Sequence, residues 1–261
     1  MSKFFARLQV KPQTQRVISY VFYALFALLI IYNIMNTTNN VHKLMYGLLL
    51  VIPLGFALWS EHLKSLYQKA IHQLAFDLDP TLASQTYDEL IKKDKANAYK
   101  NSRIIFDVLV NLDQLQLDKV KTLLSSNEKF FHSSLDQLLI YHYVTFMVAF
   151  LTNDVTTAKD EYKRMERMKD TKVKGMKVSP LFNWDFLLGM YQFMRKDVKQ
   201  SINTLNSVNT TYMNPRECAQ YYYVCAKIGK TNKDSAFYTT NIEKLTALNG
   251  KSALCRKGEN I

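Results

Sequence analysis

Residues 17–35 read VISYVFYALFALLIIYNIM, and residues 44–59 read LMYGLLLVIPLGFALW. Neither run contains Lys, Arg, Asp or Glu, and the short polar linker 36–43 separates them. As an α-helix, the first run is about 28 Å long, close to the thickness of the hydrocarbon core of a bilayer. The pair therefore predicts a transmembrane helical hairpin over residues 17–59, with spans at 17–35 and 41–60.

The second span is the weaker of the two. Its apolar run has only 16 residues, and Pro53 removes one helical hydrogen bond inside it. If this run does not cross the membrane, the rest of the chain lies outside the cell. The odd number of cysteines (Cys218, Cys225 and Cys255) is then hard to explain, because such a set is typical of reduced thiols in a reducing compartment.

The distribution of charge predicts the orientation of the hairpin. The chain carries a net charge of +12, and its first 16 residues contain four Lys and Arg and no acid. The linker between the two runs has only Lys43. By the positive-inside rule, we expect a multi-pass protein of the cell membrane with both termini in the cytoplasm.

Two basic stretches suggest partners. The segment 1–16 is read as a basic cytoplasmic tail, which is attracted by anionic lipid. The second basic stretch, 159–177, either contacts anionic lipid or nucleic acid or is simply a solvated helix face. Nucleic acid is the less expected partner, because no aromatic residue for base stacking lies between Arg164 and Lys177.

Beyond the hairpin, the sequence predicts an all-α chain. Glycine (7) and proline (5) are scarce, and apolar residues recur with the helical period. A polar break followed by an amphipathic helix occurs five times, each with an aspartate expected at the helix N-cap. These residues are Asp79, Asp118, Asp154, Asp197 and Asp234, spaced by 39, 36, 43 and 37 residues.

A more apolar helix is expected before each break. These helices are placed near 62–76, 97–112, 133–151, 180–195 and 215–229. The chain then forms about five antiparallel helix pairs over residues 61–249, followed by a basic C-terminal tail, 250–261. Since one pair cannot bury its own apolar face, successive pairs must stack, which predicts an α-solenoid.

The pairs resemble the tetratricopeptide repeat (TPR) family in degenerate form. The residues that carry the resemblance are Trp184, Leu187 and Tyr191 on one first helix, and Asp154, Ala158 and Tyr162 on one second helix. Leu188 departs from the family pattern, which has glycine there. A generic α-solenoid and an irregular helical bundle remain alternatives.

The resemblance implies a concave groove, lined by the first helices, that receives a segment of a partner protein. Polar residues spaced three or four apart on those helices are then the candidates for binding. They are Lys100, Arg103, Asp107, Asn111, Gln137, Tyr141, Asp185, Gln192, Arg216, Gln220 and Tyr223.

No motif in the chain indicates catalysis. The five histidines lack metal-ligand spacing, and no phosphate-binding loop or nucleophile motif is present. We therefore expect no enzyme, no metal and no cofactor, although a site assembled from distant residues would escape sequence analysis.

The leading interpretation is a membrane-anchored protein–protein interaction module with a scaffold or chaperone-like role. The alternative is a small accessory subunit of a membrane transport or secretion complex that acts through its spans.

Overall fold

The computed structural model describes residues 12–169, 171–173, 176–177 and 183–257. Most of the predicted basic tail therefore lies outside the described residues. The chain divides into two compact units, Met1–Ser65 and Leu66–Ile261, and the division falls inside a helix.

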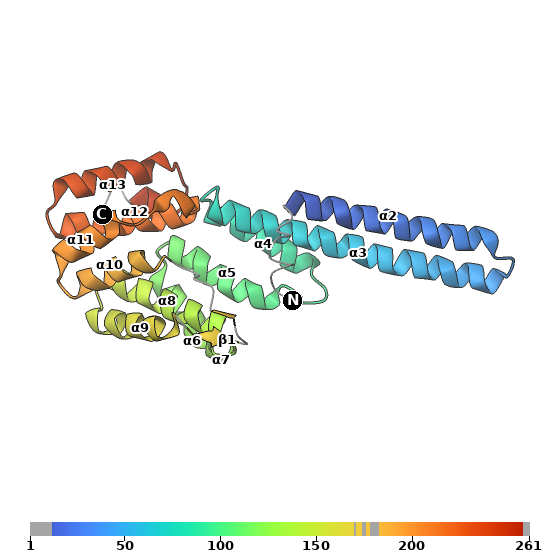
Figure 1. Cartoon of the computed structure of the whole chain (residues 1–261), viewed down its shortest axis with the longest axis horizontal. Helices are drawn as coiled ribbons and strands as arrows, with labels where there is room; N and C mark the ends of the chain where they lie inside the picture. Colours follow the sequence, from blue (N-terminus) through green and yellow to red (C-terminus); the bar gives the residue numbers. More distant parts are fainter. Residues whose placement is uncertain (1–11, 170, 174–175, 178–182, 258–261) are drawn as a thin grey trace. The chain divides into compact units, whose positions relative to one another are not determined.

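The first unit is a helical hairpin (Figure 1). Helix α2 (Pro12–Asn36) and helix α3 (Asn40–Ala75) are joined by three residues, so both predicted spans are helical. Pro53 lies within α3 without ending it. Asn33, the strongly polar residue of the first span, donates from Nδ2 to the carbonyl oxygen of Leu29 at 2.8 Å, and so is satisfied within its own helix.

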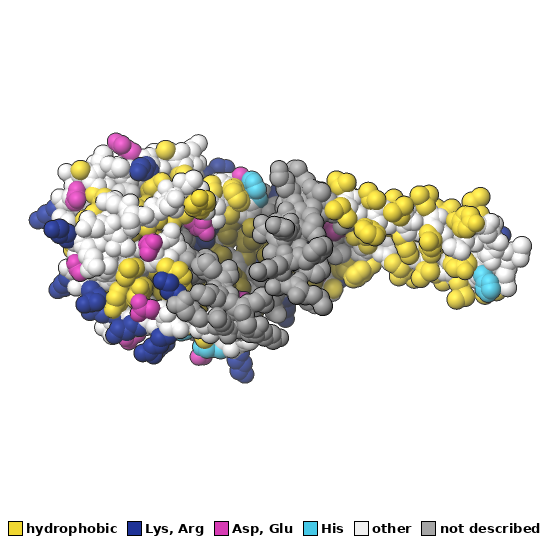
Figure 2. All heavy atoms as spheres, viewed as in Figure 1, with side chains coloured by type: hydrophobic (Ala, Val, Ile, Leu, Met, Phe, Trp, Pro, Cys, Tyr) yellow, Lys and Arg dark blue, Asp and Glu magenta, His cyan; other side chains and the backbone are white. Residues whose placement is uncertain are grey.

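Large apolar side chains cover the outside of the hairpin (Figure 2). Phe22, Leu28 and Val51 are 67%, 63% and 67% exposed. Among the described helices, α3 and α8 (Leu135–Thr152) are long and apolar enough to cross a membrane, whereas the apolar part of α2, Tyr20–Asn36, is shorter. Half of the 18 residues of α8 are buried inside the protein, which is typical of a core helix. In α3, none of the residues in its most apolar 18-residue stretch is buried.

The second unit is built from helices that follow one another in pairs. After α4 (Pro80–Lys93) come α5 (Lys100–Asp113) and α6 (Leu117–Ser126), the short α7 (Glu128–Phe131), α8 and α9 (Val155–Met168), α10 (Trp184–Met194) and α11 (Val198–Asn206), η1 (Thr210–Tyr212), α12 (Pro215–Thr231) and α13 (Ser235–Ala247), and α14 (Ala253–Lys257). Within each of the pairs α5–α6, α8–α9, α10–α11 and α12–α13 the two helices pack together.

The all-α prediction is confirmed, and four of the five expected first helices agree with α5, α8, α10 and α12 to within a few residues. The prediction of a separate helix at 62–76 is wrong, because α3 continues from the hairpin to Ala75 without a break. The start expected at Pro180 lies outside the described residues. A two-residue ribbon follows α9: β1 (Lys172–Val173) pairs antiparallel with β2 (Met176–Lys177).

A left-handed turn recurs between the helices of each pair. Its central residues, Leu78, Leu115, Asn153, Lys196 and Lys233, all have positive φ, and they lie 37, 38, 43 and 37 residues apart. The N–H of the following residue bonds back to the preceding helix, as from Gln116 to the Asn111 carbonyl oxygen at 2.9 Å. This turn reverses the chain, and the second helix starts two residues after the residue with positive φ.

The residue after each turn is the N-cap of the second helix. Asp79, Asp154 and Asp234 accept hydrogen bonds from helix N–H groups as predicted, whereas Asp197 occupies the N-cap without such a bond. The prediction for Asp118 is wrong: Gln116 is the N-cap there, and Asp118 lies in the first turn of α6. The preference for aspartate at N-caps favoured the nearest aspartate.

Glycines allow two of the pairs to approach closely. A Cβ on Gly189 would come within 2.6 Å of Leu205, and a Cβ on Gly229 within 2.8 Å of the Tyr238 nitrogen. Gly189 is the neighbour of Leu188, the position at which this chain departs from the TPR pattern. In the α10–α11 pair, the glycine that allows close helix contact therefore lies one residue after the position of the family's glycine.

A buried polar cluster joins the first helices of the second, third and fifth pairs. Arg216 on α12 donates from Nε and Nη2 to the two carboxylate oxygens of Asp113 on α5, at 2.5 and 3.0 Å. Gln220 donates to the same carboxylate at 3.0 Å and accepts from the hydroxyl of Tyr143 on α8 at 2.9 Å. The side chains of Arg216 and Asp113 are 13% and 3% exposed.

This cluster corrects part of the predicted groove. Arg216, Gln220 and Gln192 were expected on an open polar surface, but Gln220 and Gln192 are buried and Arg216 is held in the ion pair. The physical reason for Arg216 and Gln220 is that α12 contacts α5 and α8 through these side chains, and Gln192 lies on α10, which packs against α9 and α12. The inward faces of these helices therefore meet inside the unit.

The C-terminal segment is also more than a basic tail. The backbone N–H of Lys251 donates to the Leu78 carbonyl oxygen at 3.0 Å, and its ammonium group lies 2.9 Å from Asp79. Leu254 and Cys255 are buried, and α14 packs on α12 and α13. Residues 250–257 therefore belong to the packed unit because they carry apolar side chains between the basic ones.

We expect Arg216→Met to lower the free energy of unfolding by about 3–5 kcal/mol, because it leaves the Asp113 carboxylate buried and unpaired. The double variant Asp113→Leu/Arg216→Met should recover most of this loss. The measurement is urea unfolding of the full chain in detergent, followed by circular dichroism. Lys93→Met, which breaks an exposed pair with Glu89, is the control and should cost about 1 kcal/mol or less. Equal losses for the two single variants would contradict the structural role of Arg216.

Candidate functional site

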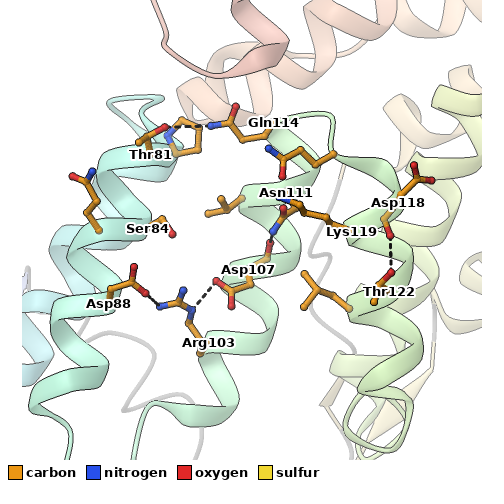
Figure 3. A pocket seen from close by; sticks show the side chains of 15 residues that line it. Thr81, Ser84, Asp88, Arg103, Asp107, Asn111, Gln114, Asp118, Lys119 and Thr122 are labelled. Atoms are coloured by element: carbon orange, nitrogen blue, oxygen red, sulfur yellow. Dashed lines mark hydrogen bonds and ion pairs between the residues drawn. The ribbon is translucent and has the colours of Figure 1, made fainter.

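A groove of about 760 Å³ opens between α4, α5 and α6 (Figure 3). Its floor is one face of α5, which carries Arg103, Asp107, Asn111 and Gln114 at spacings of three or four residues. The walls come from α4 and α6, the second helices of the first two pairs. The groove thus lies between two second helices over a single first helix, and is not lined by several first helices side by side.

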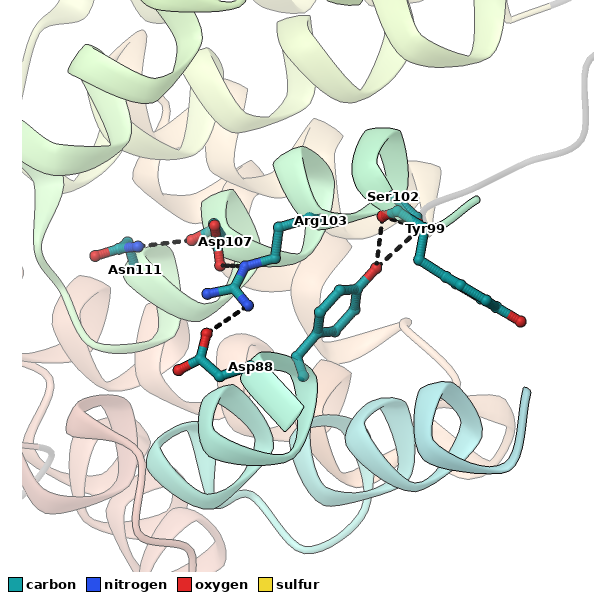
Figure 4. A network of polar contacts seen from close by, with 7 residues as sticks. Asp88, Tyr99, Ser102, Arg103, Asp107 and Asn111 are labelled. Carbon is teal, nitrogen blue, oxygen red and sulfur yellow. Dashed lines mark hydrogen bonds and ion pairs between the residues drawn. The ribbon is translucent and has the colours of Figure 1, made fainter. Parts of the chain in front are cut away.

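Arg103 is the centre of a polar network at one end of the groove (Figure 4). Its Nη1 lies 2.7 Å from Asp88 on α4, and its Nε lies 2.7 Å from Asp107, one turn further along α5. The guanidinium carbon is 5.2 Å from the ring centroid of Tyr87. Arg103 therefore links α4 to α5, and two carboxylates share its single charge.

The same network orients a buried tyrosine. The hydroxyl of Tyr87 lies 2.9 Å from Ser102 Oγ and 3.3 Å from the Tyr99 carbonyl oxygen, and burial raises the pKa of Tyr87 to about 12. Partial burial opposes the charge of Arg103, but the hydrogen bonds to Asp107 and Asp88 outweigh it and raise the Arg103 pKa. Arg103 is therefore a permanent cation beneath the groove.

Carboxamides and hydroxyls line most of the rest. Thr81, Ser84 and Gln85 project from α4, and Gln116 and Thr122 project from the opposite wall. Gln114 Nε2 lies 3.5 Å from Thr81 Oγ1 at the end away from Arg103 (Figure 3). Such a lining supplies hydrogen-bond donors and acceptors but no nucleophile with an adjacent base.

Three of the eleven predicted binding residues line this groove: Arg103, Asp107 and Asn111. Lys100 is exposed at the start of α5 but does not line it. The stripe predicted on α5 is thus brought together with residues of α4 and α6 that the sequence analysis did not select.

The other predicted residues lie elsewhere. On α8, Gln137 accepts a hydrogen bond from Ser134 Oγ at 3.1 Å, and Tyr141 packs against the rings of Phe131 and His132. Asp185 is exposed in the first turn of α10. Tyr223 packs against a buried cluster that contains Leu78, and burial raises its pKa.

The residues that sequence analysis missed are those on the second helices, above all Asp88 and Gln85. A signal was present, since Thr81, Ser84, Gln85 and Asp88 are spaced three or four apart on α4. These residues were not predicted to bind because the TPR resemblance assigns partner binding to the first helices.

A second groove occupies the equivalent position further along the chain. It lies between α11, α12 and α13, has a volume of about 430 Å³, and is lined partly by Tyr221, Tyr222 and Phe237. The Lys244 ammonium is 5.8 Å from the Tyr222 ring centroid. This groove is smaller and more aromatic than the first.

Away from the grooves, other polar side chains join neighbouring helices. His142 Nδ1 on α8 lies 2.5 Å from Glu161 on α9, and Arg164 lies 3.1 Å from the same carboxylate. Lys227 on α12 donates to the carbonyl oxygens of Phe150 and Leu151 at the C-terminal end of α8. Among the described residues, no group of three or more His, Cys, Asp or Glu is placed to hold a metal ion.

We expect Arg103→Gln to lower the free energy of unfolding by about 1 kcal/mol or less, because its carboxylate partners remain partly exposed to water. Urea unfolding of the full chain in detergent tests this beside Arg216→Met. A loss as large as that of Arg216→Met would show that Arg103 is part of the fold and not of an accessible groove.

Comparisons of the chain with protein-family models, with curated proteins and with solved structures find no match. The site is therefore interpreted from the chemistry of its own residues.

Proposed function

We propose that the protein is a membrane-anchored interaction module whose groove between α4, α5 and α6 binds a segment of a partner protein. The observation that carries this proposal is the convergence of the α5 stripe with polar residues of α4 and α6 around an open groove of about 760 Å³. The helix pairs serve as a TPR-like repeat that holds these three helices in place.

The hairpin supports the anchoring part of the proposal. Its exposed apolar side chains would each gain about 1.5–3 kcal/mol on leaving water. Both helices are continuous, so their backbone N–H and C=O groups can bond within the helix, as a bilayer core requires. Pro53 is an exception in α3, because it has no N–H to donate. In this arrangement both termini face the cytoplasm, and the basic tail contacts anionic lipid.

Anchoring explains how a modest groove becomes effective. A binding site held at a membrane meets partners of the same membrane at a high effective concentration, so that weak contacts suffice. A scaffold or chaperone-like role needs such reversible capture, and it needs no catalytic group in the groove.

Site-specific photocrosslinking in native membranes tests this function. With benzoylphenylalanine in place of Gln85 on the groove wall, we expect a crosslinked partner. The same probe at Glu89, on the same helix but outside the groove lining, should give none. Ser84→Trp should abolish the Gln85 product by filling the groove, whereas Thr240→Trp in the second groove should not. Identical products from Gln85 and Glu89 would contradict docking in the groove.

One observation favours the alternative, an accessory subunit that acts through its spans. A Cβ on Gly47 or on Gly55 of α3 would meet no atom within 4 Å, which leaves room there for another helix.

Replacing the segment 17–59 by an unrelated transmembrane hairpin separates the two functions. We expect the Gln85 crosslink to survive the replacement, because the groove is built entirely from residues after Leu66. Loss of the crosslink in a variant that still inserts and folds would favour action through the spans.

A further inference from the structure

We infer that the groove between α4, α5 and α6 binds its partner as an extended segment of about five residues, with a Lys or Arg side chain at the end formed by Asp88 and Asp107. This inference rests on the proposed function and adds the conformation and the charge of the bound segment.

The dimensions of the floor set the length of the segment. From Arg103 to Gln114, α5 rises about 16 Å at 1.5 Å per residue. An extended chain covers that distance in about five residues, at roughly 3.3 Å each.

The lining favours an extended chain over a helix. A bound helix satisfies its own backbone and needs an apolar groove for its apolar face. Carbon atoms make up much of this lining, from Pro80, Val110, Leu123 and the stems of polar side chains, but the groove also carries four carboxamides, three hydroxyls and five charged groups that a helix would leave unused. An extended segment has backbone N–H and C=O groups without partners of their own. Carboxamides can both donate hydrogen bonds to and accept them from such groups, and they lie on both walls of the groove.

The charges of the groove select a cationic side chain. Asp88, Arg103 and Asp107 together carry −1, in a chain whose net charge is +12. The side chains of Asp88 and Asp107 are 54% and 27% exposed, so both carboxylates remain accessible beside Arg103. On the opposite wall, Asp118 and Lys119 are neighbours of opposite sign and leave no net charge.

An acidic side chain would meet the reverse situation at that end. Arg103 already faces two carboxylates, so an added acid would compete with Asp88 and Asp107 for one guanidinium. Figure 4 shows the three side chains gathered at one point, and Figure 3 shows the neutral contact of Thr81 with Gln114 at the far end. Hydrogen-bonding groups thus occur along the length of the groove, and its net negative charge lies at the end formed by Asp88 and Asp107.

Defined peptides test the inference on the full chain in zwitterionic nanodiscs, which do not themselves attract cationic peptides. The probes are fluorescent, capped hexapeptide pools in which one scanned position is Lys, norleucine or Glu and the others are mixtures of Ala, Ser, Thr and Gln. Binding is measured by fluorescence anisotropy at low salt, with empty nanodiscs as the blank.

We expect the Lys pool to bind most tightly and the Glu pool most weakly. Two backbone N-methyl groups in the best Lys peptide should weaken its binding at least about tenfold, because they remove main-chain donors.

Asp88→Asn should weaken binding of the Lys peptide about threefold to fivefold and leave binding of the norleucine peptide unchanged. Glu89→Gln removes the same charge outside the groove lining and is the matched control.

Several outcomes would overturn the inference: tighter binding of the Glu pool, indifference to N-methylation, equal effects of Asp88→Asn and Glu89→Gln, or no binding of any pool. A helix-stapled peptide that binds better than its extended counterpart would also overturn it. In each case a groove-dependent crosslink from Gln85 would show that the proposed function survives. Loss of that crosslink as well would refute both.

Discussion

The buried ion pair between Arg216 and Asp113 is the contact on which the arrangement of the helical unit depends. Its two residues lie 103 positions apart, and they bring α12 against α5 with almost no exposure to water. A charge pair at such a site is tolerated only when each partner is satisfied, and Gln220 and Tyr143 complete that requirement. The fold is therefore closed through its first helices.

In the proposed function, this closure decides where a partner can bind. With the inward faces of α5, α8 and α12 packed together, the accessible polar surface along α5 beyond its first turn carries Arg103, Asp107 and Asn111. The second helices α4 and α6 form walls on either side of it. Because the first helices pack on one another, the grooves of this unit lie between successive second helices. The groove between α11, α12 and α13 has the same arrangement.

The two arginines show how different physical settings give different roles to similar residues. Arg216 is enclosed, so its loss exposes a buried charge to an apolar interior. Arg103 holds its two carboxylates at a surface where water still screens them, so it can shape a binding site at little cost to stability. The apolar hairpin adds a separate constraint, because its large exposed apolar side chains lose free energy in water and would be stabilised by burial.

Local signals in the sequence were enough to predict the longer helices and the caps at Asp79, Asp154 and Asp234, because each depends on residues within a few positions of one another. The short helices α7 and α14 were not predicted. The cap at Gln116 was missed because glutamine is not a preferred N-cap residue, whereas Asp118 two positions later is of the preferred type. The sequence also predicted the α5 stripe, yet it could not separate Arg103 from Arg216. Only the tertiary structure decided that one faces a groove and the other is buried, because burial is set by which distant helices pack together.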